Sequence, residues 1–369
     1  MAFLIISPES WSAHSVSKHH YARLLANLGH QVFFLGKPDS FFSPIKLQSV
    51  KEVSGLTVVR SSVIFPGLRF LPSFVRLFLE SRWLKKLESI SHQKINVIWL
   101  FENSRFYDLR FAGSRLKIYH QVDLNQNFNP SIAALTADIC FCTTRHIKTL
   151  LDSYNSRCYM LRHGVSISTK LFQLSTYQDS LFDDDVIHAM YVGNLDMTYL
   201  DHDLIYNVIS RQPDICFHLV GGYQVTGSLY RRLKQFKNVI WWGQVSSDLI
   251  PSLLQKADIL MVAYQAEFHV EQANPHKMME YLSSGKIIVS TYTEEFVEQA
   301  HLIAMSSAGT NSAYPQLFAT VASDLRFFNS PKMQVARKDF ASQNTYFNQL
   351  ERIKSFSARH HLNFPIDVV

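Results

Sequence analysis

A short segment in the second half of the chain carries side chains that could bind a phosphorylated nucleotide. Residues 274–286 read Asn-Pro-His-Lys-Met-Met-Glu-Tyr-Leu-Ser-Ser-Gly-Lys. Asn274 is a good N-cap because its side chain can accept a hydrogen bond from a backbone N–H, and Pro275 suits the first helical position. Gly285 can adopt the left-handed conformation that ends a helix. The segment therefore predicts a short helix.

The helical period divides the side chains of this segment into two faces. The face expected in the core carries Met278, Met279 and Leu282. The other face carries a cation, a carboxylate and a phenol: Lys277, Glu280 and Tyr281. Backbone N–H groups and the helix dipole attract phosphate at the helix start, and Glu280 could accept two hydrogen bonds from a ribose diol. The alternative is an ordinary capped helix in which Lys277 and Glu280 form a solvated pair.

The segment and the Ile-Ile-Val-Ser-Thr that follows it resemble the donor site of GT-B glycosyltransferases, written N-P-x-K-x-x-E-Y-L-x-x-G-K-P-V-V. The resemblance implies that Glu280 holds the ribose of a nucleotide diphosphate sugar. It also implies that the pyrophosphate meets the backbone of Asn274, Pro275 and His276, with Lys277 supplying charge. Ile287 replaces the family's proline. The family resemblance implies no cofactor and no bound metal, with the sugar nucleotide as the donor substrate.

A second group of polar residues follows an apolar run at residues 118–122. Ligands gather at the carboxyl ends of parallel strands, so Asp123 could take a proton from an acceptor hydroxyl. The stretch "IYHQVDLNQNF" resembles the v-Y-D-x-V-D-D segment of bacterial GT-B enzymes that build surface polysaccharides, with Asp123 on the first aspartate of the terminal pair. His120 replaces an earlier aspartate and is the alternative base or a helper. Two plainer interpretations stay open: Asp123 caps a turn with Asn125, and His120 is a hydrogen-bonded core histidine.

Two loops of the first half are assigned to the acceptor side. The loop after the first predicted strand contains Trp11 and His14, and it lacks the glycine pair usual in the family. Glu102 lies in the loop that follows the apolar run at 96–100. No G-x-G-x-x-G follows the first strand, which argues against a dinucleotide-binding dehydrogenase.

The second half contains three turns at predicted strand ends. Gly193 and Asn194 occur in "YVGNLD", which resembles the family's Y-V-G-x-L turn, and Gly193 would let a ligand approach the backbone. Asn194 stands where many relatives have arginine. Gly222 lies in a glycine pair, and Gln244 lies in a loop that resembles the one holding the base. We expect these four residues to line the donor site.

The chain of 369 residues is longer than one compact core usually needs, and apolar runs alternate with helical patterns throughout. We therefore expect an α/β protein of the GT-B fold, with two Rossmann-like domains whose parallel sheets face across a cleft. The expected domains are residues 1–170 on the acceptor side, 171–340 on the nucleotide-sugar side, and a closing helix in 341–369 that packs back on the first.

A basic, aromatic stretch at residues 66–87 could lie in a membrane interface, although a surface helix with its apolar side on the sheet is the commoner case. The net charge of +6 favours anionic partners. The basic residues are dispersed and no reader motif occurs, so nucleic acid is not expected. Four cysteines form no C-x-x-C pair, and no apolar run reaches the ~20 residues of a membrane span. We expect a cytoplasmic protein, with the inner face of the membrane as a second place of action.

The sequence thus predicts a glycosyltransferase of the hexosyltransferase type that uses a nucleotide diphosphate sugar and a saccharide or lipid-linked acceptor in bacterial surface polysaccharide synthesis. A sugar-nucleotide epimerase of the same fold and a non-catalytic nucleotide-binding module are the alternatives.

Overall fold

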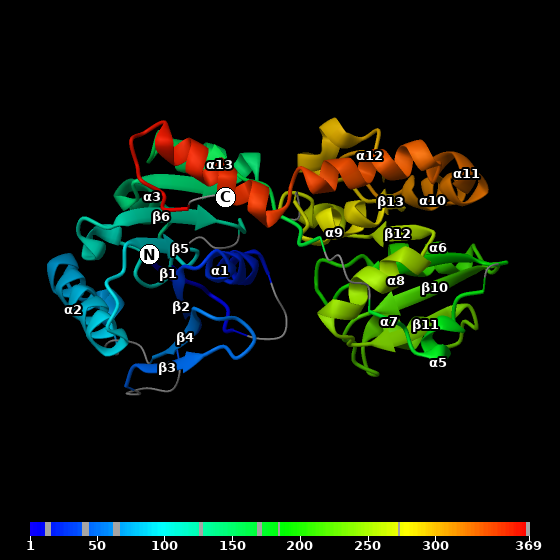
Figure 1. Cartoon of the computed structure of the whole chain (residues 1–369). Helices are drawn as coiled ribbons and strands as arrows, with labels where there is room; N and C mark the ends of the chain where they lie inside the picture. The colour runs from blue at the N-terminus through cyan, green and yellow to red at the C-terminus, as the bar shows by residue number, and fades with distance from the viewer. Residues whose placement is uncertain are drawn as a thin grey trace. The chain divides into compact units, whose positions relative to one another are not determined.

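The computed structural model describes the chain except for residues 12–15, 39–43, 62–66, 125–127, 168–171, 184, 272–273 and 367–369. The chain divides into two compact units. The first consists of Met1–His163 with Tyr346–Val369, and the second of Gly164–Thr345. Each unit is built on its own sheet with helices packed on it (Figure 1).

The sheet of the first unit has the strand order β3-β4-β2-β1-β5-β6-β7-β8. Its strands are β1 (Ala2–Ile6), β2 (Gln31–Leu35), β3 (Lys46–Ser49), β4 (Leu56–Arg60), β5 (Val97–Leu100), β6 (Leu116–Gln121), β7 (Ile139–Cys142) and β8 (Cys158–Met160). All neighbours are parallel except β3, which runs antiparallel to β4 at the edge. The predicted parallel sheet is thus observed with one antiparallel edge strand, because the short link between β3 and β4 allows only a hairpin.

Both faces of this sheet are covered at its centre, so β1, β5 and β7 are apolar throughout rather than alternating. In β1, Leu4 and Ile6 pack into one core cluster while Phe3 and Ile5 pack into the other. The helices are α1 (Ser17–Asn27), η1 (Leu68–Phe70), α2 (Ser73–Ser91), η2 (Leu109–Ala112), α3 (Pro130–Thr136), α4 (Arg145–Asp152) and α13 (Tyr346–Ala358). Side chains of α1 and α13 share the cluster with Phe3, whereas those of α2, α3 and α4 belong to the other.

The sheet of the second unit is parallel, in the order β11-β10-β9-β12-β13-β14. Its strands are β9 (Ile187–Val192), β10 (Ile215–Val220), β11 (Val239–Gly243), β12 (Ile259–Val262), β13 (Ile287–Ser290) and β14 (Ala304–Met305). Its helices are α5 (Thr176–Asp179), α6 (His202–Ser210), α7 (Ser228–Leu233), η3 (Ser247–Leu249), α8 (Ile250–Lys256), η4 (Ala266–Phe268), α9 (Lys277–Ser284), η5 (Glu294–Gln299), α10 (Tyr314–Ser323), α11 (Leu325–Phe328) and α12 (Pro331–Ser342).

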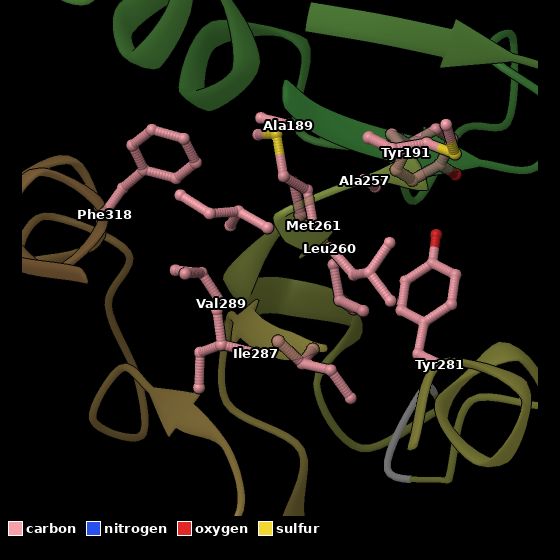
Figure 2. Packing of buried hydrophobic residues seen from close by; sticks show 14 of the residues in the cluster. Ala189, Tyr191, Ala257, Leu260, Met261, Tyr281, Ile287, Val289 and Phe318 are labelled. Carbon is pink, nitrogen blue, oxygen red and sulfur yellow. The ribbon is translucent and has the colours of Figure 1, made fainter. Parts of the chain in front are cut away.

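The core of the second unit lies around its central strands. Figure 2 shows Ala189 and Tyr191 of β9, Leu260 and Met261 of β12 and Val289 of β13 packed together, with Tyr281 of α9 reaching in beside them. None of the helices formed by the described residues is long and apolar enough to cross a bilayer.

A buried arginine fixes α12 in the second unit. Arg337 is 0% exposed, and its guanidinium donates to three backbone carbonyls: Leu302 O at 2.8 Å, Gly285 O at 3.0 Å and Phe328 O at 2.8 Å. Burial lowers the pKa of Arg337 to about 10, so the group stays cationic at neutral pH. One side chain therefore supplies hydrogen-bond donors to carbonyl groups at the end of α9, in the segment before β14 and at the end of α11.

We expect Arg337→Met to lower the free energy of unfolding of the second unit by roughly 2–4 kcal/mol, because three buried carbonyls lose their donor. Urea unfolding would measure this. Arg326→Met, at an exposed position of α11, is the control and should change stability little. Equal stability of the two variants would contradict this view of Arg337.

Candidate functional site

The carboxyl ends of β9, β10 and β11 are joined by hydrogen bonds between their exit loops. Gly193 N–H donates to Val220 O at 2.8 Å, and Gly221 N–H donates to Gly243 O at 2.8 Å. Leu195 N–H donates to Gly222 O at 2.9 Å. Three of the turns predicted from the sequence thus form one continuous edge of the second unit.

Two glycines allow the turns to approach closely. A Cβ at Gly221, where φ is +140°, would lie 2.0 Å from Gly193 O. A Cβ at Gly193, where φ is +149°, would lie 2.7 Å from Lys277 Nζ. Side chains at either position would separate β9 from its neighbours or displace the lysine.

The polar residues predicted at these turns are on the surface. Asn194 is exposed, and its Oδ1 accepts a hydrogen bond from Asp196 N–H at 2.9 Å. Gln244 is exposed just beyond β11. Both follow directly on the glycine turns and are exposed at this edge.

Helix α9 begins at Lys277, two residues later than the sequence predicts. Its N-cap is His276, whose side chain makes no capping bond, rather than Asn274. Pro275 O accepts from Met278 N–H at 3.1 Å, so one tighter turn precedes the helix and moves its start. Asn274 is buried, with 7% exposure. The predicted end is confirmed, since Gly285 adopts φ +82°.

Lys277 is held by aromatic rings near the end of β9. Its Nζ lies 3.9 Å from the centre of the Tyr191 ring and 5.5 Å from the centre of the Tyr264 ring. Among the described residues it has no carboxylate or carbonyl partner within hydrogen-bonding distance. Burial lowers the pKa of Lys277, and Glu280 opposes this shift. The ammonium is thus positioned by cation–π contacts while its hydrogens stay available for an anion.

Glu280 lies one turn further along α9, with a side chain that is 39% exposed. The Nδ1 atom of His276 lies 3.9 Å from its Oε1. Lys277 and Glu280 form no ion pair with each other, so the interpretation of these two as a solvated pair is not what the structure shows. Desolvation raises the pKa of Glu280, but contact with water limits this shift. The carboxylate is therefore open to a ligand.

Tyr281 is not on the polar face of α9, where the sequence analysis placed it. It is 0% exposed, and its hydroxyl oxygen accepts a hydrogen bond from Val192 N–H at 2.8 Å. Figure 2 shows its hydroxyl directed toward the strand that carries Tyr191. The ring fills the core while the oxygen satisfies the last N–H of β9, so this tyrosine ties the helix to the strand.

Comparisons with known proteins agree with this geometry. The sequence profile described as "Glycosyl transferases group 1" matches residues 187–313, which carry the glycine turns and α9. This part of the chain is thus similar to the group 1 glycosyl transferases. Over 121 residues the chain is 28% identical to TuaH of Bacillus subtilis (strain 168), assigned as a glycosyltransferase of teichuronic acid biosynthesis. The aligned segment spans only 30% of this chain and 30% of that relative.

Solved structures extend the likeness to the whole chain. Sucrose-phosphate synthase from Thermosynechococcus elongatus has a TM-score of 0.71 at 10% identity, covering 98% of this chain and 99% of that one. Anabaena Alr3699/HepE in complex with UDP has a TM-score of 0.69 at 14% identity, covering 97% and 100%. WaaG, a glycosyltransferase involved in lipopolysaccharide biosynthesis, has a TM-score of 0.62 at 12% identity, covering 96% and 99%. The predicted GT-B fold is confirmed.

Asp123 lies just beyond β6 in the first unit, and its side chain is exposed. Asn125, its predicted partner in a capped turn, is outside the described residues. An ion pair that the sequence analysis missed lies close enough to act on the charge of Asp123. Lys18 Nζ meets Glu9 Oε2 at 2.6 Å, and the Lys18 side chain is 2% exposed whereas that of Glu9 is 41% exposed. The only sequence signal for this pair was a lysine among the buried positions of α1.

His120 lies in the core of the first unit rather than at its surface. It is 2% exposed, and its ring lies 4.9 Å from Phe101 and 6.1 Å from Trp99 between centroids. Among the described residues neither ring nitrogen has a hydrogen-bond partner, which also departs from the expected hydrogen-bonded histidine. Burial lowers the pKa of His120 to about 3. A neutral, enclosed ring packs the aromatic core, and Asp123 is left as the exposed candidate base.

The predicted acceptor-side residues occupy three different settings. Trp11 packs edge-on against Phe34 at 5.0 Å and lines a hollow of about 510 Å³ together with Lys37 and other residues of the β2, β3 and β4 ends. Glu102 is 9% exposed and closes its own loop by accepting from Ser104 N–H at 2.7 Å. His14 lies outside the described residues. Trp11 is therefore the one of the three that faces an open space among the residues described.

One cluster in the described part of the chain could supply three metal ligands: His188, Cys216 and His218. Its hydrogen bonds oppose a metal. Trp242 Nε1–H can only donate, and it meets His218 Nδ1 at 3.0 Å. The proton of His218 must then sit on Nε2, where it points at His188 Nδ1 at 2.8 Å and leaves no lone pair for a metal. We assign the cluster to structure.

Adjacent glycines offer a matched test of the strand-end geometry. We expect Gly221→Ala to lower the free energy of unfolding of the second unit by about 2–4 kcal/mol, because the new Cβ meets a backbone oxygen at a strained φ. Gly222→Ala has open space around its Cβ and should stay within about 1 kcal/mol. Denaturant unfolding of both variants would measure this difference. Similar stabilities would contradict the close approach of Gly221 to the Gly193 carbonyl.

Proposed function

We propose that this protein transfers a sugar from a nucleotide diphosphate sugar to a saccharide or lipid-linked acceptor in the synthesis of a bacterial surface polysaccharide. The relative TuaH is assigned to teichuronic acid biosynthesis, and WaaG to lipopolysaccharide biosynthesis. Anabaena Alr3699/HepE has been solved in complex with UDP-glucose. These relatives support both the donor class and the type of product.

The observation that carries the proposal is the open pair of opposite charges on the first turn of α9, beside the glycine turns of β9 and β10. The diphosphate would lie at the N-terminus of α9, between Lys277 Nζ and the turn at Gly193. Glu280 would accept hydrogen bonds from the ribose hydroxyls. Asn194, Gly222 and Gln244 would complete the donor side, with Gln244 toward the base.

The chemistry needs a leaving diphosphate and an activated acceptor hydroxyl. Lys277 and the N–H groups at the start of α9 would stabilise the negative charge that grows on the diphosphate as the glycosidic bond breaks. Asp123 would accept the proton of the attacking hydroxyl, with Lys18 and Glu9 setting the charge around it. Trp11 would offer a flat apolar face to the acceptor sugar. We place the reaction in the cytoplasm, where reduced thiols suit the free Cys140, Cys142, Cys158 and Cys216.

The role of Glu280 can be isolated with two ligands. We expect Glu280→Gln to weaken UDP binding by about tenfold or more, since hydrogen bonds to a charged group are lost. Binding of 2′,3′-dideoxy-UDP, which lacks the ribose hydroxyls, should be nearly the same in both proteins. Calorimetric titration measures this, and GDP replaces UDP if UDP does not bind. An equal loss for both ligands would argue against a ribose contact.

The role of Asp123 is tested by turnover. We expect Asp123→Asn to lower kcat by about 10²–10⁴-fold with unchanged donor affinity, because only proton removal is lost. Asp152→Asn, at an exposed ion pair of α4, is the control and should keep full activity. Release of an altered free sugar nucleotide would favour the epimerase. Donor binding without any product in either protein would favour the binding module.

A further inference from the structure

The hairpin of β3 and β4 at the edge of the first unit's sheet has one face that is only partly buried (Figure 1). In β4, Leu56 belongs to the core cluster that includes α1, and Val59 belongs to the cluster on the other face. Because side chains alternate along a strand, Val58 and Arg60 lie on the same face as Leu56. Leu56 is 1% exposed, whereas Val58 is half-buried and Arg60 is exposed. The core on this face therefore ends between Leu56 and Val58.

A hollow of about 510 Å³ lies where this core ends. Val58 and Gln48 line it, and the two residues are partners in the register of β4 and β3. Trp11 lines it as well. The indole ring is held in place by Phe34 at 5.0 Å and by the Arg23 guanidinium at 4.9 Å from the ring centre. A space of this size, with apolar walls and a few charged groups, suits a small ligand or one part of a larger ligand.

The charge around the hollow is positive. Among the described residues that line it, Lys37, Lys51 and Arg60 are cations and Glu52 is the one carboxylate. Lys37, Lys51 and Glu52 are exposed, and within the described part of the chain none of the three forms an ion pair. Lys37 follows β2 and Arg60 ends β4, whereas Lys51 lies in the turn at the other end of the hairpin. Cations on both sides of one hollow favour a ligand with negative charge.

The hollow is remote from Asp123, the exposed candidate base. In the sheet, β4 is separated from β6 by β2, β1 and β5, and Asp123 follows β6. Because neighbouring strands lie about 4.8 Å apart, β4 lies about 19 Å across the sheet from β6. One sugar ring does not span this distance. A group bound in the hollow would thus belong to a different part of the acceptor from the hydroxyl that reacts.

We propose that this hollow binds a carboxylate or phosphate group on a non-reacting sugar of the acceptor. We call it the cationic hollow (Trp11, Lys37, Lys51, Val58 and Arg60). The inference rests on the proposed sugar transfer and narrows its acceptor to an anionic chain of several sugars. Arg and Lys would attract the anion with charge-assisted hydrogen bonds, while Trp11 and Val58 would contact the apolar C–H groups of the ring. The hollow would therefore determine which acceptor binds without contacting the reacting atoms.

The test is fluorescence anisotropy of the full chain with end-labelled tetragalacturonate, a linear tetrasaccharide with a carboxylate on each ring, and with its neutral methyl ester. We expect tetragalacturonate to bind about tenfold or more tightly than the ester, because charge-assisted hydrogen bonds need the carboxylates. Lys37→Glu/Lys51→Glu should weaken the binding of tetragalacturonate by about tenfold or more, because two attractions become repulsions. Glucuronate and glucose 6-phosphate are added as competitors, and the better competitor identifies the anion as a carboxylate or a phosphate.

Lys94→Glu/Lys332→Glu is the matched control, because it makes the same change of net charge at two exposed lysines outside the hollow. It should bind tetragalacturonate like the unmodified protein. Equal losses in the two double variants overturn the proposal, since they would show only an effect of net charge. Equal binding of tetragalacturonate and its ester overturns it as well.

The affinity for UDP or GDP separates this inference from the proposed function. All the proteins should unfold at the same temperature and bind the nucleotide equally, because the substituted lysines are exposed and lie outside the donor turns. If the unmodified protein binds the nucleotide but not tetragalacturonate, the inference about the hollow is wrong and the proposed function stands. If it binds no nucleotide and transfers no sugar, the proposed function is wrong.

Discussion

The contact between α9 and β9 is the interaction on which the second unit's chemistry depends. The hydroxyl oxygen of Tyr281 takes the final N–H of the strand, and the ammonium of Lys277 rests on the ring of Tyr191 in that same strand. Both contacts lie in surroundings of low polarity, where hydrogen bonds and cation–π attractions are stronger than in water. Together they fix the position of α9 along its axis and its rotation about that axis. The positions of the ammonium and of Glu280 relative to the glycine turns follow from this.

The first unit fixes its loops by a similar use of buried polar groups. Arg105 Nη2 donates to Gly36 O at 2.6 Å and to Ser7 O at 3.2 Å, so one side chain joins the loops after β1, β2 and β5. Lys18 and Glu9 join α1 to the first of these loops. In the first unit, single side chains thus hold the loops at the carboxyl ends of strands. In the second unit, hydrogen bonds between the loop backbones do this.

The sequence predicted the strands well and the surroundings of single side chains less well. The apolar runs at 96–100 and 118–122 located β5 (Val97–Leu100) and β6 (Leu116–Gln121) within two residues, because buried parallel strands must be apolar on both faces. The start of α9 and the setting of Tyr281 were misjudged. Tyr281 is buried because the apolar face of α9 is wide enough to include it and because the N–H of Val192 needs an acceptor. Val192 lies far from Tyr281 in the sequence, so helical periodicity alone did not reveal this contact. His120 shows the same limit, as do the exposed Phe74 and Phe78 of α2, since the periodicity of a helix or strand does not reveal which neighbour covers each face.

The hydrogen bonds through Trp242, His218 and His188 have a consequence for behaviour in acid. This series of hydrogen bonds begins at Trp242 Nε1–H, which can only donate. It ends at the carbonyl oxygen of Asp183, which can only accept and lies 2.9 Å from His188 Nε2. A second proton on His218 would sit on Nδ1 and face the Nε1–H donor of Trp242. Desolvation lowers the pKa of His218 from 6.5 to about 3. The unfolded chain binds that proton more readily, so stability falls as the pH drops below about 6.5 toward 3. The three strands joined by these hydrogen bonds would loosen together in acid, and so would the core of the first unit around His120, whose pKa burial also lowers to about 3.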